Sequence, residues 1–402
     1  MIKEINIPNG WKEIELGNLG TFSKGKGLSK SELKDGGYPC IRYGEIYTKH
    51  DIKIKEFYSF IDEDSAKNSK KVQLNDLLFA GSGETLSEIG KCVSYNLSHK
   101  AYVGSDIIIL RFSSDVIISI YASYFINSIG RKQLNKMGSG NSVVHIYAKD
   151  LEKVKIVLPP LQEQKAIVDI LEKWDGAIEK TSKLIEAKKK RFEWLSKVLI
   201  DKNRSAHWKE LRLEEIFLFL KGGSGLSKDS ITEEGLNKCI LYGQLYTTYS
   251  EVITKVLSKT NSINGVKSKA GDILIPSSTT TTAKDLANAT AILEDNVLLG
   301  GDINILRPNI KDVDSEFFSY YLTHYKKNIL ASKGQGVTII HLYSSHIKDI
   351  IVDLPPLSQQ KKIAKILNAT KKEITILEEI LSKYKNQKRG LMQQLLTGKI
   401  RA

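Results

Sequence analysis

The sequence has few of the residues that mark disulfide-linked, metal-binding or membrane proteins. Only three of its 402 residues are cysteines, Cys40, Cys92 and Cys239, and their spacing fits neither a disulfide framework nor a metal site. No apolar run approaches the roughly 18–20 residues that a membrane helix needs. The N-terminal segment has no apolar stretch after a basic start, unlike a secretory signal. We therefore expect a cytoplasmic protein that does not enter a membrane.

Motifs for phosphate-loop, dinucleotide and metal chemistry are also missing. Residues 23–30, SKGKGLSK, have glycine and lysine in the wrong order for a phosphate loop. Neither Pro-Pro pair belongs to an amino-methyltransferase motif, because Leu158 and Leu354 precede them. His145 and His341 each stand before an aromatic residue in a strand-like run, where packing or surface roles are commoner than catalysis. We assign no catalytic or metal-binding residue, and the sequence favours a binding or scaffolding protein over an enzyme.

What the sequence does contain is an internal repeat. LPPLQEQKAIVDIL at 158–171 recurs as LPPLSQQKKIAKIL at 354–367, and GSDIIILR at 104–111 recurs as GGDINILR at 300–307. Other blocks follow in the same order, with small changes in spacing of the kind that loop insertions produce. Several ordered matches over most of both halves indicate a tandem duplication of a unit of about 200 residues.

Each unit has a β-rich part and a helical part. Short strand-like runs, such as 40–47 and 239–246, alternate with turn clusters in residues 1–157 and 205–353. One helix-like segment interrupts each part, at 117–137 and 315–330. These patterns predict two mixed α+β domains.

The helical parts, 158–204 and 354–402, begin with Pro-Pro and carry apolar residues in a 4-3 alternation over more than four heptads. Such a seam predicts a long antiparallel two-helix coiled coil that separates the two globular domains about a pseudo-twofold axis. The alternative is that each helix folds back on its own domain.

Three polar loops recur in both β-rich parts and are the candidate DNA-binding sites. The first combines lysines with glycines, whose backbone N–H groups can approach phosphates. The second follows a Tyr-Gly turn, and its copies differ at groups able to recognise base edges: arginine suits guanine, glutamine adenine, and glutamate cytosine. The third is rich in Gly, Ser and Thr. The candidates are Lys24, Lys26, Lys30, Arg42, Tyr43, Tyr47, Ser82, Thr85, Lys221, Lys228, Tyr242, Gln244, Tyr246, Ser278, Thr279 and Thr280.

A matched framework with divergent loops is what two domains that recognise different short DNA sequences would show. The alternative is that the loops drifted after duplication and that their Gly, Ser and Thr content only marks turns.

With these features the sequence resembles the specificity subunit of type I restriction–modification enzymes. The resemblance covers nearly the whole chain and is most specific at 158–164, at 354–360 and at KRGLMQQLLTGKIR, 388–401. It implies two target-recognition domains, each recognising one half of a bipartite double-stranded DNA target. The helices would set the spacer and dock two modification subunits.

The resemblance also implies that this chain has no catalytic activity and holds no cofactor. S-adenosylmethionine, ATP and Mg²⁺ would be used by the modification and restriction subunits. The chain departs from the family pattern where Gln359 replaces the glutamate seen at Glu163, for which we expect a small effect, and where the first helix lacks the terminal Thr-Gly-Lys. The competing hypotheses are a duplicated protein-interaction scaffold without DNA specificity, and a fused nuclease or methyltransferase.

The net charge of +14 does not by itself indicate DNA recognition. Residues 1–150 carry a net charge of +3 and residues 205–347 a net charge of zero, whereas residues 151–204 carry +4 and residues 348–402 carry +7. Eleven of the fourteen excess charges therefore lie in the helical segments. We expect that surface to face the DNA backbone or acidic partner subunits.

Overall fold

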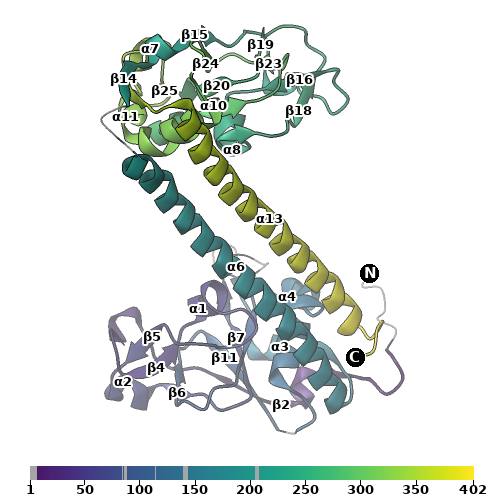
Figure 1. The fold of residues 1–402 in the computed structure, drawn as a ribbon. Coiled ribbons are helices and arrows are strands. Elements are labelled where there is room, and N and C mark those ends of the chain that lie inside the picture. Colours follow the sequence, from purple (N-terminus) through teal and green to yellow (C-terminus); the bar gives the residue numbers. More distant parts are fainter. Residues whose placement is uncertain (1–6, 84, 86–87, 114, 139–143, 204–207) are drawn as a thin grey trace. The chain divides into compact units, whose positions relative to one another are not determined.

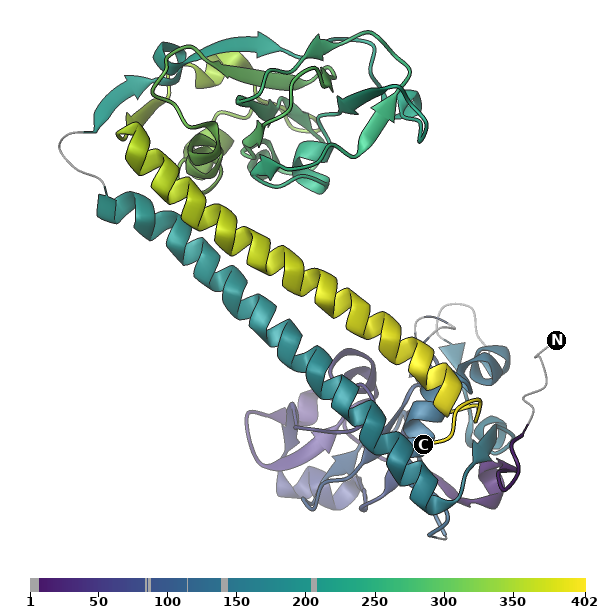
Figure 2. The same ribbon diagram turned by 45° about the vertical axis from the view of Figure 1, so that its right-hand side comes forward.

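A computed structural model describes residues 7–83, 85, 88–113, 115–138, 144–203 and 208–402 (Figures 1 and 2). The chain forms two compact units. Unit 1 comprises Met1–Thr181 with Ile380–Ala402, and unit 2 comprises Ser182–Glu379. Each unit contains one globular domain and part of both long helices.

The globular domain of unit 1 is α+β. In its described residues, a four-stranded sheet has the order β2-β11-β7-β9 and a five-stranded sheet the order β3-β5-β4-β10-β6, while β1 pairs with β13 and β8 with β12. The strands are β1 (Lys12–Glu15), β2 (Gly20–Lys24), β3 (Leu33–Lys34), β4 (Tyr38–Ile41), β5 (Ser59–Ile61), β6 (Lys70–Lys71), β7 (Asp76–Ala80), β8 (Ser82–Gly83), β9 (Cys92–Tyr95), β10 (Tyr102–Val103), β11 (Ile107–Phe112), β12 (Val144–His145) and β13 (Lys155–Leu158). The α-helices are α1 (Tyr43–Thr48), α2 (Glu63–Asn68), α3 (Ser119–Ser128), α4 (Arg131–Met137) and α5 (Ala148–Leu151).

The globular domain of unit 2 repeats this plan. In the part of it that is described, one sheet has the order β15-β24-β20-β22-β17 and another the order β18-β16-β23-β19, while β14 pairs with β26 and β21 with β25. The strands are β14 (Lys209–Arg212), β15 (Phe217–Lys221), β16 (Asn237–Ile240), β17 (Val252–Ile253), β18 (Ser258–Thr260), β19 (Val266–Lys267), β20 (Asp272–Pro276), β21 (Ser278–Thr279), β22 (Thr290–Ile292), β23 (Leu298–Leu299), β24 (Ile303–Pro308), β25 (Ile340–His341) and β26 (Ile351–Leu354). The helices are α7 (Leu213–Ile216), α8 (Gln244–Thr247), α9 (Ala283–Leu286), α10 (Ser315–Tyr320), α11 (Lys327–Ser332) and α12 (Ser344–Ile347), with a π-helical turn at Tyr321–Tyr325.

The predicted α+β fold class and the internal duplication are confirmed, but two local expectations were wrong. The run 40–47 is not one strand: β4 ends at Ile41 and α1 begins at Tyr43, and in unit 2 β16 and α8 divide the matching run in the same way. The single helices expected over 117–137 and 315–330 are each divided, into α3 and α4 in unit 1 and into α10, the π-helical turn and α11 in unit 2. Short runs that mix apolar and aromatic residues suit a strand as well as a buried helix, so periodicity cannot separate them.

Within each unit, the parts of the long helices α6 (Leu161–Asn203) and α13 (Leu357–Leu395) that belong to it lie side by side and antiparallel (Figures 1 and 2). In unit 1 the rings of Trp174 and Tyr384 pack edge to face with centroids 5.6 Å apart. In unit 2 the ammonium of Lys188 lies 2.6 Å from the Glu373 carboxylate. Apolar residues of both helices also complete the core of each domain. These residues are Ile167, Leu171 and Leu395 in unit 1, where Leu396 directly after α13 joins them, and Phe192, Ile200, Ile363, Leu367 and Ile374 in unit 2.

The recurring Leu-Pro-Pro-Leu-x-x-Gln motif joins each helix to its domain through a fully buried glutamine. The side-chain oxygen of Gln164 accepts from the backbone N–H of Ile118 at 2.9 Å, and its amide donates to the carbonyls of Val116 and Pro159 at 2.8 and 3.0 Å. Gln360 makes the same three kinds of bond in unit 2. The motif therefore fixes how each domain sits on the first turn of its own helix.

We expect Gln164→Ala to destabilise unit 1 by about 2–4 kcal/mol, because it leaves buried backbone groups without partners and each costs roughly 1–3 kcal/mol. Gln162 lies two residues earlier on the same helix turn and is exposed, so Gln162→Ala is the matched control and should change stability by less than about 0.5 kcal/mol. Urea denaturation followed by circular dichroism measures both. Equal stability of the two variants would contradict the structural role of the motif.

The Glu-to-Gln difference between the two motif copies coincides with a difference in tertiary contacts. Trp11 donates its indole N–H to Glu163 at 3.1 Å, and Trp208 donates in the same way to Gln359 at 3.0 Å. Only Glu163 also receives two bonds from the guanidinium of Arg401, at 2.6 and 2.7 Å. Burial of Glu163 acts to raise its pKa, but the bonds from Arg401 and Trp11 outweigh it and the pKa is lowered.

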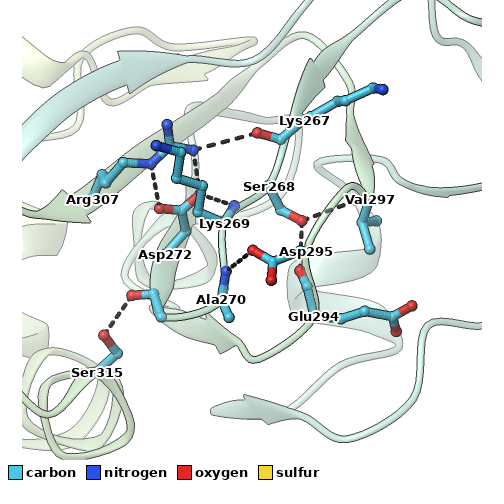
Figure 3. A network of polar contacts seen from close by, with 11 residues as sticks. Lys267, Ser268, Lys269, Ala270, Asp272, Glu294, Asp295, Val297, Arg307 and Ser315 are labelled. Atoms are coloured by element: carbon cyan, nitrogen blue, oxygen red, sulfur yellow. Dashed lines mark hydrogen bonds and ion pairs between the residues drawn. The ribbon is translucent and has the colours of Figure 1, made fainter.

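A buried carboxylate–guanidinium pair also recurs in both domains. Figure 3 shows the pair in unit 2, where Arg307 on β24 donates to both oxygens of Asp272 at 2.8 and 2.7 Å. Asp272 also accepts from the backbone N–H of Lys269 at 2.8 Å, which holds the loop before β20. In unit 1, Arg111 binds Asp76 in the same bidentate way at 2.9 and 2.7 Å. Each pair joins two neighbouring strands of the central sheet.

Candidate nucleic-acid interface

The lysines of the first loop lie on the surface of both domains. Lys24 ends β2 and Lys221 ends β15. Lys26 follows in the adjoining loop, and Lys30 and Lys228 each begin a short 3-10 helix. All five side chains are exposed. Their exposure is compatible with phosphate contacts, and their assignment to DNA stays a prediction.

The glycines of this loop have a structural role that differs from the phosphate contact considered from sequence. The N–H of Gly25 donates to the carbonyl of Ile107 at 2.8 Å, so it already has a partner within the domain. A Cβ at Gly25 would lie 1.9 Å from the carbonyl oxygen of Gly104, and one at Gly222 would lie 1.8 Å from that of Gly300. Glycine is therefore required at both positions because two backbone segments touch there.

The second loop forms the first turn of a short helix in each domain. Arg42 is half-buried and Tyr43 is exposed at the start of α1. Glu45 accepts from the backbone N–H of Arg42 at 3.1 Å through one carboxylate oxygen and from the hydroxyl of Ser59 through the other. This carboxylate holds the turn together, so it is not presented for base recognition.

The corresponding turn in unit 2 uses an amide in the same way. The side-chain oxygen of Gln244 accepts from the backbone N–H of Leu241 at 2.9 Å, and its amide donates to the hydroxyl of Ser258 at 2.6 Å. The Glu-to-Gln difference, considered from sequence as a difference in base recognition, thus lies at a turn-stabilising position. Tyr242 and Tyr246 beside it are half-buried, with ring centroids 6.5 Å apart.

The third loop is mostly buried. Ser82 of β8 and both Ser278 and Thr279 of β21 are buried, whereas Thr85 and Thr280 are exposed. Of the candidates in this loop, only the last two are exposed. The buried ones contribute to the pairing of β8 with β12 and of β21 with β25.

Hydrogen bonds connect the second and third loops of unit 1. The hydroxyl of Tyr47 donates to the carbonyl of Ser82 at 2.6 Å, and burial raises the pKa of this phenol. The hydroxyl of Ser82 lies 3.1 Å from Nδ1 of His145 on the neighbouring strand. The side chains of Tyr47 and Ser82 therefore hold the second loop, the third loop and β12 together.

A groove of about 370 Å³ in unit 1 brings together residues from distant parts of the chain. Lys24 from the first loop and Ser82 from the third line it, together with His145, Tyr147 and Lys149. Arg42, Tyr43 and Thr85 are not among its lining residues. Lys24 is thus the one exposed sequence candidate in the groove lining. The His145–Lys149 segment was not predicted as part of the interface, although the duplication contained a signal, since His145 and Tyr147 recur as His341 and Tyr343.

The described part of the chain holds neither a cluster of metal ligands nor a membrane-spanning helix. Within the residues placed by the structure, no group of three or more His, Cys, Asp or Glu side chains could hold a metal ion. Among the same residues, no helix combines the length and apolar character needed to cross a membrane.

Comparison with known proteins identifies the duplicated unit. The family model for the type I restriction modification DNA specificity domain matches twice, over residues 8–189 and 206–386. The putative type I restriction enzyme MjaX specificity subunit of Methanocaldococcus jannaschii is 28% identical over 98% of this chain and 95% of its own length. The MjaVIII specificity subunit of the same organism is 24% identical over 99% and 94%.

Solved structures show the same fold. The S subunit of a type I restriction–modification system from M. genitalium superposes with a TM-score of 0.62 at 18% identity, over 98% of this chain and 97% of that chain. A chain from a study of complex assembly and conformational transition of the type I R-M system gives a TM-score of 0.59 at 16% identity, over 98% and 100%. Because the family's domain model matches nearly all of both halves, this chain belongs to the DNA specificity family of type I restriction–modification systems.

Proposed function

We propose that the chain directs a type I restriction–modification complex to a bipartite DNA target, with each globular domain recognising one half. The observation that carries this proposal is the duplication itself: the two domains share the order of their central strands, the buried Asp–Arg pair and the glutamine motif, yet differ in their exposed loop residues. Conserved scaffolds with different surface groups suit the recognition of two different base sequences. Nothing in the comparisons favours the alternative of a protein-interaction scaffold.

We propose further that the chain is non-catalytic and acts in the cytoplasm with two modification subunits and with restriction subunits. The long paired helices would dock the modification subunits and set the spacer between the half-sites. S-adenosylmethionine, ATP and Mg²⁺ would bind to those partner subunits. Support comes from the family membership and from the concentration of excess positive charge in residues 151–204 and 348–402.

The test of domain-by-domain recognition is a change in one half-site alone. Arg42→Ala combined with Tyr43→Ala removes the group suited to guanine and its exposed neighbour from unit 1. We expect discrimination in one half of the target to fall by about 1–3 kcal/mol, the value of a good bidentate base contact, and the other half to be unchanged. The measurement is methylome sequencing of cells that express the chain with its modification subunit.

The matched control is Tyr242→Ala in unit 2, which should reduce base discrimination in the opposite half-site. An equal loss of discrimination in both half-sites, caused by either variant, would contradict recognition by separate domains. A scaffold without DNA specificity would instead give no bipartite methylated motif even with the unaltered chain. It would also lack the steep loss of DNA affinity with rising salt that phosphate contacts produce.

A further inference from the structure

Each domain presents a stacked His–Tyr pair to which the proposed function assigns no role. β12 ends at His145 and β25 ends at His341, and each strand pairs antiparallel with the third loop, at Ser82 and Ser278. Two residues further along extended backbone, side chains return to the same face, which places Tyr147 and Tyr343 beside the histidines. The ring centroids are 6.5 Å apart in unit 1 and 5.4 Å apart in unit 2, with interplanar angles of 27° and 7°.

These tyrosines are on the surface and outside the cores. Tyr147 is 54% exposed and Tyr343 is 45% exposed. One exposed aromatic residue on a protein surface needs no explanation. Here the same exposed ring recurs at the same position of both domains, stacked on the same neighbour. Packing of the domain does not account for that repetition.

In unit 1 a lysine lies beside the pair, and in unit 2 a lysine ends β15, the strand that pairs with β24. In unit 1, Lys24 lines the same groove, and the ammonium of Lys149 lies 5.7 Å from the centre of the Tyr147 ring. Asp106 also lines this groove, and its carboxylate offsets part of the positive charge of the two lysines.

In unit 2, Lys221 pairs across the sheet with Asn304. The amide of Asn304 donates to the carbonyl of Leu342 at 2.6 Å, and its side-chain oxygen accepts from the hydroxyl of Ser344 at 3.1 Å. These bonds hold the residues on either side of Tyr343 next to the strand that carries Lys221.

Comparison of the two copies indicates what such a pair would contact. Residues that recognise bases must differ between domains with different half-sites, as Arg42 and Leu241 do. The sugar–phosphate backbone is the same in every sequence, so residues that bind it can be identical in both copies. His145 and Tyr147 are identical to His341 and Tyr343, and Lys24 corresponds to Lys221.

We propose that the two His–Tyr pairs are sequence-independent contacts to the DNA backbone, one in each half-site. The tyrosine hydroxyl donates to a phosphate oxygen while the ring packs on the adjoining deoxyribose, and the neighbouring lysine neutralises the phosphate. In unit 1 the bond between Ser82 and His145 fixes the histidine ring on which the tyrosine stacks. This inference rests on the proposed function, because it assigns the backbone contacts of the same DNA-binding surface.

The test compares two DNA duplexes. The full chain is assembled with its modification subunits and titrated against two duplexes. One duplex contains the target sequence that the complex methylates, and the other contains the same bases in scrambled order. Fluorescence anisotropy measures the Kd for each duplex. We expect Tyr147→Ala to weaken binding to both duplexes about tenfold, as loss of a hydrogen bond to a charged group predicts, and to leave their Kd ratio unchanged. Tyr343→Ala should act in the same way.

Two further variants separate the contact from a general effect on folding. Tyr147→Phe keeps the ring and loses the hydroxyl, so it should lose part of the affinity. Tyr58, 42% exposed on the same domain but not lining the groove, provides the control, and Tyr58→Ala should bind as the unaltered chain does. Circular dichroism verifies that each variant is folded.

Unchanged Kd in both tyrosine-to-alanine variants would overturn the inference, and so would a loss confined to the target duplex, since that would indicate base recognition. Failure of the proposed function gives a different result. In that case the unaltered complex would bind the two duplexes equally, before any variant is tested.

Discussion

Replacing Asp272 with alanine is expected to destabilise the globular domain of unit 2 by about 3–5 kcal/mol, the usual cost of removing one partner of a buried ion pair. The side chain of Asp272 is fully buried and that of Arg307 is 20% exposed. The substitution leaves the Lys269 N–H without its acceptor and the Arg307 guanidinium with the Lys267 carbonyl, at 3.3 Å, in place of the carboxylate (Figure 3). Because domains are stable by only about 5–15 kcal/mol, this loss is a large fraction of the total.

The internal repeat supplies a matched comparison. Asp76→Ala removes the equivalent carboxylate of unit 1, where Arg111 is more exposed, at 33%, and more of its charge can be solvated. We therefore expect Asp76→Ala to destabilise its domain less than Asp272→Ala does. Urea denaturation, with hydrogen exchange to show which domain unfolds, measures both. Loss of protection in the wrong domain, or a cost below about 1 kcal/mol for Asp272→Ala, would contradict the role assigned to the pair.

The second large effect is expected from shortening both helices by one heptad. In the proposed function the helices set the spacer, and removal of seven residues shortens an α-helix by about 10 Å. Deleting 182–188 from α6 with 373–379 from α13 removes facing segments of unit 2, including the Lys188–Glu373 ion pair. The methylated motif should then keep both half-sites and have a spacer shorter by no more than about three base pairs.

Methylome sequencing of cells with the shortened chain provides the readout. Glu373→Gln alone breaks the same ion pair without changing helix length, and it should leave the spacer unchanged. A shortened chain that folds, assembles and still methylates the original motif would refute the proposal that helix length determines the spacer. Deletion from one helix only should disrupt the antiparallel register and abolish assembly.

Much of the architecture could be predicted because its signals are local or repeated. Seven-residue periodicity predicted the helices that the structure places at Leu161–Asn203 and Leu357–Leu395. The repeat predicted two domains of one fold. The candidate interface was harder to predict, because the exposure of a side chain depends on residues that are far away in the sequence. Ser278 and Thr279 were candidates on composition alone, and pairing with β25 buries them.

Some features missed from sequence had a signal in the duplication. Asp76 with Arg111 and Asp272 with Arg307 stand at the same separation in both copies, as do His145 with Tyr147 and His341 with Tyr343. A comparison of the copies shows that such pairs recur, but it does not show what they contact. Glu45 and Gln244 show the opposite case, where a difference between the copies looked like base specificity and proved to lie in a helix turn.

The duplication, the fold class, the two long helices and the family resemblance follow from the sequence, because each depends on order and periodicity along the chain. Three features emerge only when distant segments pack: Gln164 and Gln360 bind the backbone of a distant loop, Arg401 pairs with Glu163, and Lys24, Ser82 and Tyr147 line one groove. These are contacts between residues tens to hundreds of positions apart. They form only when the strands and helices pack, and no local pattern in the chain encodes the distance between them.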